Sequence, residues 1–252
     1  MAKNPTPRFL LDDGPLFAVW KPAGLATQAP EPFPSLELQM KDWLRRRDAK
    51  EGNVYLGVPH RLDRPVSGVI LFTRHVRAAS RVSLQFEKRQ VRKVYWACVE
   101  GVVDPAEGTW TDHLKKTYGK PHAEVVDSND PAGRPAVLRY RTLGTFALPN
   151  GEAASALGTW LEIELETGRT HQIRIQAASR GHAVVGDAFY GAKSTFGAEP
   201  VDERDRHIAL HARSIELRHP MTNAPLKITA PLPADWRSLN LPVSECDFLT
   251  DV

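Results

Sequence analysis

One carboxylate stands among cations in the segment HRLDRPVSGVILFTR, residues 60–74. Asp63 is flanked by Arg61 and Arg64, and an apolar stretch typical of a buried strand follows directly. A carboxylate close to arginine stays ionised at neutral pH and is a poor general acid, but it can be a nucleophile or stabilise positive charge. Ordinary glycoside hydrolysis needs a second carboxylate, which is not evident nearby in the sequence. The alternative role for Asp63 is an ion pair that fixes the loop.

Positive charge is concentrated around this carboxylate. The 252 residues carry a formal net charge of only +3, whereas residues 60–93 alone carry +7 and the remainder carries −4. Arginine, whose planar fork suits phosphates and stacks on bases, outnumbers lysine 22 to 11. A charged run is usually a solvated helix face, but its position beside Asp63 favours an anionic ligand.

Two later segments carry side chains that suit a nucleic-acid site. Tyr95, on an expected strand, could stack on a base or be a core aromatic of that strand. In GRTHQIR, Arg169, His171 and Arg174 lie close together at the start of an expected helix, where cations oppose the helix dipole. Arg174 could therefore hold Asp63 ionised while Arg169 meets phosphates. The alternative interpretation of GRTHQIR is a charged turn at the start of a helix, without a role in binding.

A metal site is the weaker interpretation of these residues. Five side chains invite it: His60, Asp63, His171, His207 and His211. The last two have the spacing of a helical ligand pair, but IALHARSIEL is typical of a strand, where that spacing separates them by about 13 Å. Neither an HExxH motif nor a cysteine cluster occurs, so we expect no metal.

The sequence is typical of a cytoplasmic protein. Its two cysteines, Cys98 and Cys246, lie far apart and form no CxxC pair, which fits a reducing compartment. The N-terminus lacks the apolar region of a signal peptide, and no apolar run approaches the roughly 20 residues that span a bilayer. We expect no membrane contact and a monomer.

The hydrophobic pattern predicts many strands and few helices. Strands are expected at residues 16–20, 66–73, 93–101, 136–144, 159–168, 208–220 and 224–231, and helices at 36–48, 75–89 and 170–181. The second helix should bury Val76, Ala79, Ser83 and Phe86 on one face. Residues 118–135 and 148–158 are interpreted as exposed loops or hairpin tips. Because no regular βαβ order appears, the sequence favours an α+β domain with a mainly antiparallel sheet.

Four segments combine reactive side chains with glycine. They are KPAG at 21–24, HRLDRPVSG at 60–68, RKVYWACVEG at 92–101 and TGRTHQIRIQAASRGHAVVGDAFYG at 167–191. In this order they resemble the motifs of the RluA family of RNA pseudouridine synthases. The resemblance covers about residues 12–235, and HRLD together with GRTHQIR is far more specific than any single short motif.

The resemblance implies a chemistry for these residues. In that family the aspartate of HRLD, here Asp63, is the catalytic residue that is needed to detach uracil from its ribose, after which the base rejoins through C5. Tyr95 is expected to stack on the target base and to help remove the C5 proton, and Arg174 to pair with Asp63. Arg61 resembles the arginine that enters the RNA stack when the target nucleotide flips out. Neither a cofactor nor a metal is implied.

The same resemblance implies an RNA-binding cleft across a mixed, mainly antiparallel central sheet flanked by helices and loops. The residues expected to bind RNA are Lys21, His60, Arg61, Arg64, Arg92, Lys93, Arg169 and His171. We divide the chain into a loose segment 1–11, a catalytic domain 12–238 and an acidic tail 239–252, which we expect to be loose as well. Many relatives carry an additional N-terminal domain of the ribosomal-protein type, which we expect to be missing here.

The second motif departs from the family pattern, which usually reads HRLDxxTSG. Pro65 and Val66 stand here, and a lost loop hydrogen bond would cost about 1 kcal/mol. An RNA-binding protein of this fold with lost catalysis therefore stays an alternative, as does a metal-dependent phosphodiesterase that uses His60, Asp63 and His171. The sequence favours an isomerase acting on uridines in tRNA or ribosomal RNA, without deciding which RNA.

Overall fold

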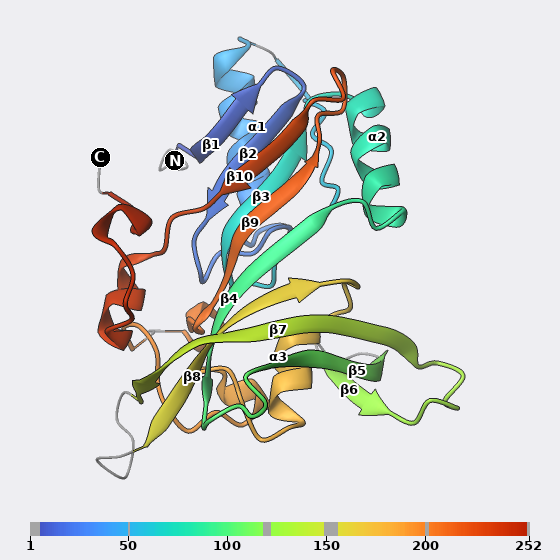
Figure 1. The fold of residues 1–252 in the computed structure, drawn as a ribbon. Coiled ribbons are helices and arrows are strands. Elements are labelled where there is room, and N and C mark those ends of the chain that lie inside the picture. The colour runs from blue at the N-terminus through green and yellow to red at the C-terminus, as the bar shows by residue number, and fades with distance from the viewer. Residues whose placement is uncertain (1–5, 50, 118–121, 149–155, 200–201, 251–252) are drawn as a thin grey trace.

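A sheet of ten strands forms the frame of the molecule (Figure 1). The computed structural model describes residues 6–49, 51–117, 122–148, 156–199 and 202–250. Its strands are β1 (Arg8–Asp13), β2 (Leu16–Lys21), β3 (Ser67–Thr73), β4 (Arg92–Glu100), β5 (Glu107–Lys116), β6 (Ala123–Val126), β7 (Arg134–Ala147), β8 (Leu157–Leu165), β9 (Leu210–Arg218) and β10 (Pro225–Thr229). The seven expected strands are all present, and β1, β5 and β6 are additional.

The strand order is β1-β2-β3-β9-β4-β8-β7-β5-β6, and β10 pairs with β9. Within the described chain β3 and β9 run parallel, whereas the other strand pairs are antiparallel. The expected α+β fold with a mixed, mainly antiparallel sheet is therefore confirmed. Late strand β9 lies between β3 and β4, which places segments that are distant in sequence side by side (Figure 1).

Three α-helices accompany this sheet: α1 (Leu36–Arg47), α2 (Val76–Glu87) and α3 (Gln172–Ala178). Helix α2 does not bury the expected face: Ala78 and Val82 are buried, and Val76 is 67% exposed. The observed face buries the apolar side chain of Val82, whereas the expected face would have buried the hydroxyl of Ser83. Because burying a hydroxyl group is costly, the observed face is the more favourable one. No helix among the described residues is long and apolar enough to cross a membrane.

Strands β2 and β3 contribute to the largest of the apolar clusters. Residues of β2 and β3 are almost completely buried, and their register pairs Phe17 with Phe72. Gly68 is the point where β3 meets β9: its φ is +124°, and a Cβ there would lie 2.3 Å from the carbonyl oxygen of Ala212. Because only glycine fits, this close contact fixes the loop that precedes β3 and contains Asp63.

Described residues near both ends of the chain, 6–13 and 239–250, take part in structure that the sequence did not suggest. Strand β1 begins at Arg8, inside the segment 1–11 that was expected to be loose, because it pairs with β2. The expected loose tail contains a short 3-10 helix, η4 (Glu245–Asp247), and Phe248 is buried in a cluster with Leu232 and Trp236. These nonlocal apolar contacts order the segment despite its acidic composition.

Two stretches, residues 118–135 and 148–158, were expected to be exposed loops or hairpin tips. Residues 118–135 contain strand β6, which hydrogen-bonds to β5, so the hairpin part of that prediction was correct. Of this stretch, residues 118–121 lie outside the described residues, as do residues 149–155 of the expected tip at 148–158.

We predict that Phe248→Ala lowers the free energy of unfolding by about 3 kcal/mol, because it removes a buried ring from this cluster. The ring also lies 4.1 Å from the Arg237 guanidinium carbon. Urea unfolding would measure the change. Cys246→Ala, in the same segment but exposed, serves as control and should cost less than about 0.5 kcal/mol. Equal stabilities of the two variants would show that the tail does not contribute to the core.

Candidate active site

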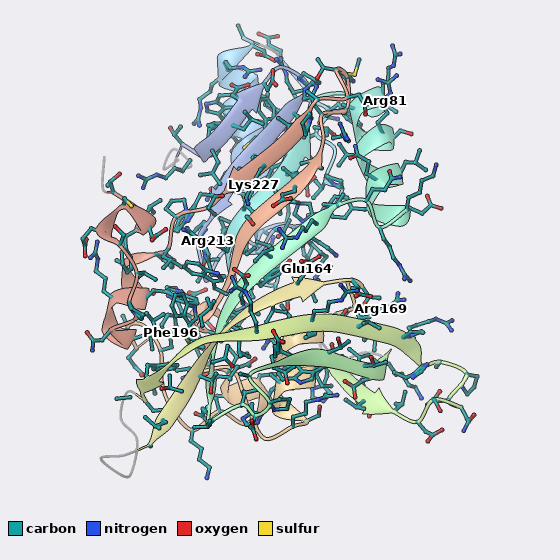
Figure 2. The ribbon with its side chains drawn as sticks, viewed as in Figure 1. Arg81, Glu164, Arg169, Phe196, Arg213 and Lys227 are labelled. Carbon is teal, nitrogen blue, oxygen red and sulfur yellow. The ribbon has the colours of Figure 1, made fainter. Side chains whose placement is uncertain are left out.

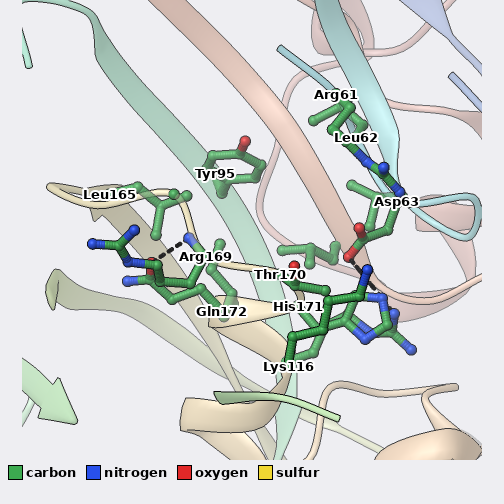
Figure 3. Close-up of a pocket in the computed structure, with 15 residues that line it drawn as sticks. Arg61, Leu62, Asp63, Tyr95, Lys116, Leu165, Arg169, Thr170, His171 and Gln172 are labelled. Carbon is green, nitrogen blue, oxygen red and sulfur yellow. Dashed lines mark hydrogen bonds and ion pairs between the residues drawn. The ribbon is translucent and has the colours of Figure 1, made fainter. Parts of the chain in front are cut away.

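A pocket of about 470 Å³ brings the three predicted catalytic residues together (Figure 3). Asp63 comes from the loop before β3, Tyr95 from β4 and Arg174 from α3, and all three line the pocket. Arg61, Arg169 and His171 line it as well, and Lys116 of β5 is a lining cation that the sequence interpretation missed. The volume is within the usual range for a small-molecule site.

Asp63 lies between two nitrogen groups without a short hydrogen bond to either. Its Oδ2 is 3.6 Å from Arg174 Nη1 and 3.7 Å from His171 Nε2. Its side chain is 21% exposed, whereas that of Arg174 is only 6% exposed. The predicted contact between Asp63 and Arg174 is thus present, as a looser charge interaction. A carboxylate held in this way keeps free oxygen lone pairs that face the pocket.

Asp187 is the closer partner of Arg174, and it was not among the predicted site residues. Its carboxylate accepts two hydrogen bonds, from Arg174 Nε at 2.6 Å and Nη2 at 2.8 Å. Asp187 is 1% exposed, so the pair is buried. The signal was the GD dipeptide in GHAVVGDAFYG: Gly186 has a φ of +86° and forms the turn that brings Asp187 back to α3.

A second contact orients His171 toward Asp63. His171 precedes α3 with a left-handed backbone, φ +53°, which costs a non-glycine residue about 1–2 kcal/mol. Its Nδ1 hydrogen-bonds the Tyr190 hydroxyl at 2.9 Å, and the Tyr190 ring lies 5.0 Å from the Arg174 guanidinium carbon. Burial lowers the pKa of His171, so its ring is neutral at neutral pH. It is therefore not the phosphate-binding cation that the sequence suggested.

Tyr95 is half-buried between the pocket and a neighbouring hollow (Figure 3). Burial, and then the negative charge of Asp63, raise the pKa of its phenol. The hydroxyl therefore stays protonated at neutral pH. What Tyr95 presents to a ligand is an aromatic face and a hydroxyl group.

The neighbouring hollow, which we call the basic groove, has a volume of about 740 Å³. Its lining cations are Arg61, Arg89, Arg92, Lys93, Arg139 and Arg169, and its lining acids are Glu87, Glu164 and Glu166. Glu164 and Arg169 can be located in Figure 2. The groove shares Arg61, Tyr95 and Arg169 with the catalytic pocket. A net positive hollow that continues from the pocket suits the phosphates of a strand.

The cations of the groove differ in how they are compensated. Arg92 forms ion pairs with Glu164 at 2.8 Å and Glu216 at 3.1 Å. Lys93 has no carboxylate partner among the described residues, and burial followed by the charge of Arg89 lowers its pKa. Of Arg92 and Lys93, which are adjacent in sequence, Lys93 is therefore the one whose charge is uncompensated.

Lys21, predicted to bind RNA, is completely buried. Its ammonium donates hydrogen bonds to the carbonyls of Pro22, Leu25 and Arg64, at 2.8, 2.6 and 3.2 Å. Burial lowers its pKa to about 7. Lys21 thus joins the loop after β2 to the Asp63 loop and does not reach a ligand, because motif membership alone does not reveal burial.

His60 and Arg64 also have structural partners. His60 Nε2 accepts a hydrogen bond from the Leu71 amide, and its ring stacks on Phe86 at 5.0 Å. Burial, and then the charge of Lys93, lower the pKa of His60 to about 3, so it provides no charge for phosphates. Arg64 lies outside the pocket and the groove, 3.6 Å from Asp205.

The histidines considered as metal ligands lie apart. His207 hydrogen-bonds Asp235 at 2.6 Å, whereas His211 is buried and bonds Ser67 at 2.8 Å. In the part of the chain that the structure describes, no group of three or more His, Cys, Asp or Glu side chains is arranged to hold a metal ion.

Comparison with known proteins agrees with this geometry. The family described as RNA pseudouridylate synthase matches residues 15–179. This chain therefore belongs to the RNA pseudouridine synthases, in the RluA family. It is 31% identical over 91% of its length to an uncharacterized RNA pseudouridine synthase of Bacillus subtilis, of which 70% is covered. It is 34% identical over 90% of its length to tRNA pseudouridine synthase C of Salmonella typhi, of which 86% is covered.

Solved structures share the fold. Human RNA pseudouridylate synthase domain containing 4 superposes with a TM-score of 0.72 over 94% of both chains, at 22% identity. Human RNA pseudouridylate synthase domain containing 1 gives a TM-score of 0.67 at 21% identity and covers 90% of this chain and 84% of that one. At such identities the likeness concerns the fold.

We predict that Arg174→Met lowers the free energy of unfolding by about 3–5 kcal/mol, because it leaves Asp187 buried and unpaired. The double variant Arg174→Met/Asp187→Leu should recover most of this loss, since it removes both charges together. Urea unfolding of the parent and the two variants measures both effects. A double variant no more stable than Arg174→Met would contradict the assignment of Asp187 as the main partner.

Proposed function

We propose that this protein isomerises uridine to pseudouridine in structured RNA, with Asp63 as the catalytic carboxylate and without a cofactor. The observation that carries the proposal is the position of Asp63: its carboxylate lines the pocket, beside a buried arginine and the ring of Tyr95. Membership of a family of isomerases supports the reaction class. The presence of two free cysteines, Cys98 and Cys246, supports our proposal that it acts in the cytoplasm.

The reaction breaks the bond between uracil N1 and ribose C1′ and forms a bond between C5 and C1′. The C5 hydrogen leaves as a proton, and N1 gains one. In our proposal Asp63 takes part in detaching the base, since its oxygens are not committed to short hydrogen bonds. Arg174 places a positive charge 3.6 Å from Oδ2 of Asp63. Nothing in these steps requires a group beyond the chain and its RNA.

Tyr95 is assigned to the target base. Its ring lies between the pocket and the basic groove, where an extruded base can stack on it. Because the pKa of its phenol is raised, Tyr95 is not a ready-made base for the C5 proton. We assign stacking on the target base and its orientation to Tyr95. The C5 proton is removed by another group, which can reach C5 only after the base has been detached.

The RNA itself is proposed to be tRNA or ribosomal RNA. Relatives at similar identity carry both kinds of name: tRNA pseudouridine synthase C, and ribosomal large subunit pseudouridine synthase D of Xylella fastidiosa, which is 32% identical over 90% of this chain and of which 66% is covered. Arg61, Lys93 and Arg169 are the proposed contacts to RNA, since they line the basic groove and have no carboxylate partner in the described chain.

Loss of catalysis, the alternative raised by the second motif, gains no support from the local packing. Val66 is 2% exposed and lies in an apolar cluster with Ile173 and Leu210. Its amide still hydrogen-bonds the Asp63 carbonyl at 3.1 Å. An apolar side chain fits this environment, and the turn that presents Asp63 is formed without the hydroxyl of a threonine.

We predict that Asp63→Asn abolishes tritium release from RNA labelled at uracil C5. The variant should retain its affinity for RNA, because the charge of a single carboxylate has little effect on the binding of a polyanion. The measurement uses tRNA and ribosomal transcripts in the presence of EDTA. Asp205→Asn is the matched control, because it makes the same change at an exposed carboxylate. Asp205 lies 3.6 Å from Arg64, which belongs to the same loop as Asp63. This variant should leave the rate unchanged.

Three outcomes of this experiment would count against the proposal. Equal release by Asp63→Asn and the parent would remove Asp63 from the chemistry. Release by the parent only when EDTA is omitted would point to a metal-dependent reaction. No release by the parent from either RNA would contradict the isomerase, and retained RNA binding would then favour a binding protein.

A further inference from the structure

Two helices of twelve residues accompany the same sheet but differ in how their cations are compensated. In α1, Lys41, Arg45 and Arg47 form ion pairs with carboxylates, and Arg46 has no carboxylate partner among the described residues. In α2 and the two residues that follow it, the cations have no carboxylate partner among the described residues; they are Arg77, Arg81, Lys88 and Arg89. We call these four residues, all exposed, the α2 cation row.

The helix spacing places three residues of the row on one outer stripe. Arg77, Arg81 and Lys88 are separated by four and seven residues, which puts them on one face along about 16 Å of helix. Arg81 donates a hydrogen bond to the carbonyl oxygen of Pro220 at 2.7 Å, which steadies the side chain without neutralising it. Figure 2 shows Arg81 on this helix.

One charge of α2, that of Arg77, is placed against the stability of the helix, whereas Lys88 and Arg89 follow its C-terminal end, where cations are favourable. Arg77 lies in the first turn, which contains no acidic residue. A cation there opposes the helix dipole and costs about 0.3–1 kcal/mol. Helix α1 shows the opposite arrangement, with Glu37 in its first turn and three arginines in its last. A solvated face would gain from the pattern of α1, so that of α2 favours a ligand.

The row continues into the site already described. Arg89 lines the basic groove together with Lys93 and Arg61, and Arg61 also lines the catalytic pocket. Uncompensated cations thus follow one another from the pocket, through the groove, to the outer face of α2. The path changes shape along its length, because it leaves the concave groove and continues on the outer side of a helix.

We propose that the α2 cation row docks a helical stem of the substrate RNA, while the adjoining unpaired strand lies in the basic groove. The inference rests on the proposed function and specifies its substrate class: a uridine in a loop or strand that is closed by a stem. Double-stranded RNA is recognised mainly through its backbone and shape. A row of cations on a convex surface matches such a backbone, whereas the aromatic ring of Tyr95 and the groove match unpaired bases.

A protein partner is the other occupant to consider for this face. Val76 and Leu84 of α2 are exposed, 67% and 45%. The core of a protein interface is depleted in charged residues and enriched in aromatic ones, whereas this face carries the four cations of the α2 cation row, which have no carboxylate partner among the described residues. The charge pattern therefore favours a polyanion over a protein.

The test compares RNA with and without stems. The variant Arg77→Gln/Arg81→Gln/Lys88→Gln should bind unfractionated tRNA and a ribosomal RNA transcript about tenfold more weakly, and its slope of log K against log salt should fall by about 2–3. Binding of oligouridylate, which has no stem, should stay unchanged. A triple control removes three exposed cations elsewhere, Arg46→Gln/Lys227→Gln/Arg237→Gln, and should bind all three RNAs as the parent does. Urea unfolding confirms that both variants are folded.

Two results would overturn the proposal. Unchanged affinity for both structured RNAs would show that the row does not contact RNA and would leave a protein partner for α2. Equal weakening for oligouridylate and structured RNA would show that the row serves the unpaired strand. The binding comparison does not depend on turnover: if the parent releases no tritium, the proposed function fails, while the difference between stem-containing and stemless RNA still decides the role of α2.

Discussion

The guanidinium of Arg174, shared between two carboxylates, is the interaction on which the site depends. A buried charge is costly unless its hydrogen bonds are satisfied, and Asp187 satisfies two donors of Arg174 in a bidentate contact. The remaining nitrogen faces Asp63 at 3.6 Å. Because Asp187 accepts hydrogen bonds from Nε and Nη2 of Arg174, Asp63 lies near the positive charge of Arg174 without forming a short hydrogen bond to it. The site therefore requires α3, the turn at Gly186 and the loop before β3 to be in place together.

A second buried cation fixes the same loop from behind. The ammonium of Lys21 bonds the carbonyls of Leu25 and Arg64, which belong to two separate loops. The contact of Gly68 with Ala212 then anchors the start of β3. Cations in this protein thus have two kinds of role. Those that are buried and fully bonded position Asp63, and those that are exposed and uncompensated are left for an anionic ligand.

Local pattern predicted most of the fold, and the motifs predicted most of the pocket. The strands and helices could be found because apolar residues recur with periods of two and 3.6. Asp187 could not be paired with Arg174 from the sequence, since their contact forms only when the turn returns to α3. For Lys21 the residue type suggested a surface cation, but burial is a property of the whole packing. The tail was misjudged for the same reason: the burial of Phe248 depends on distant residues.

The pairing of cations, more than their number, sets how strongly this surface attracts RNA. Arg92 and Arg139 line the groove, but Glu164 and Glu166 already compensate them. A phosphate that approached either arginine would have to share it with a carboxylate, and the repulsion from that acid would cancel part of the attraction. Lys93 has no such competitor among the described residues, and its partial burial lowers the screening of its charge. The net charge of +3 therefore underestimates the positive potential of the basic groove. The number of arginines that line the groove overestimates the same potential, because some of them are paired with carboxylates.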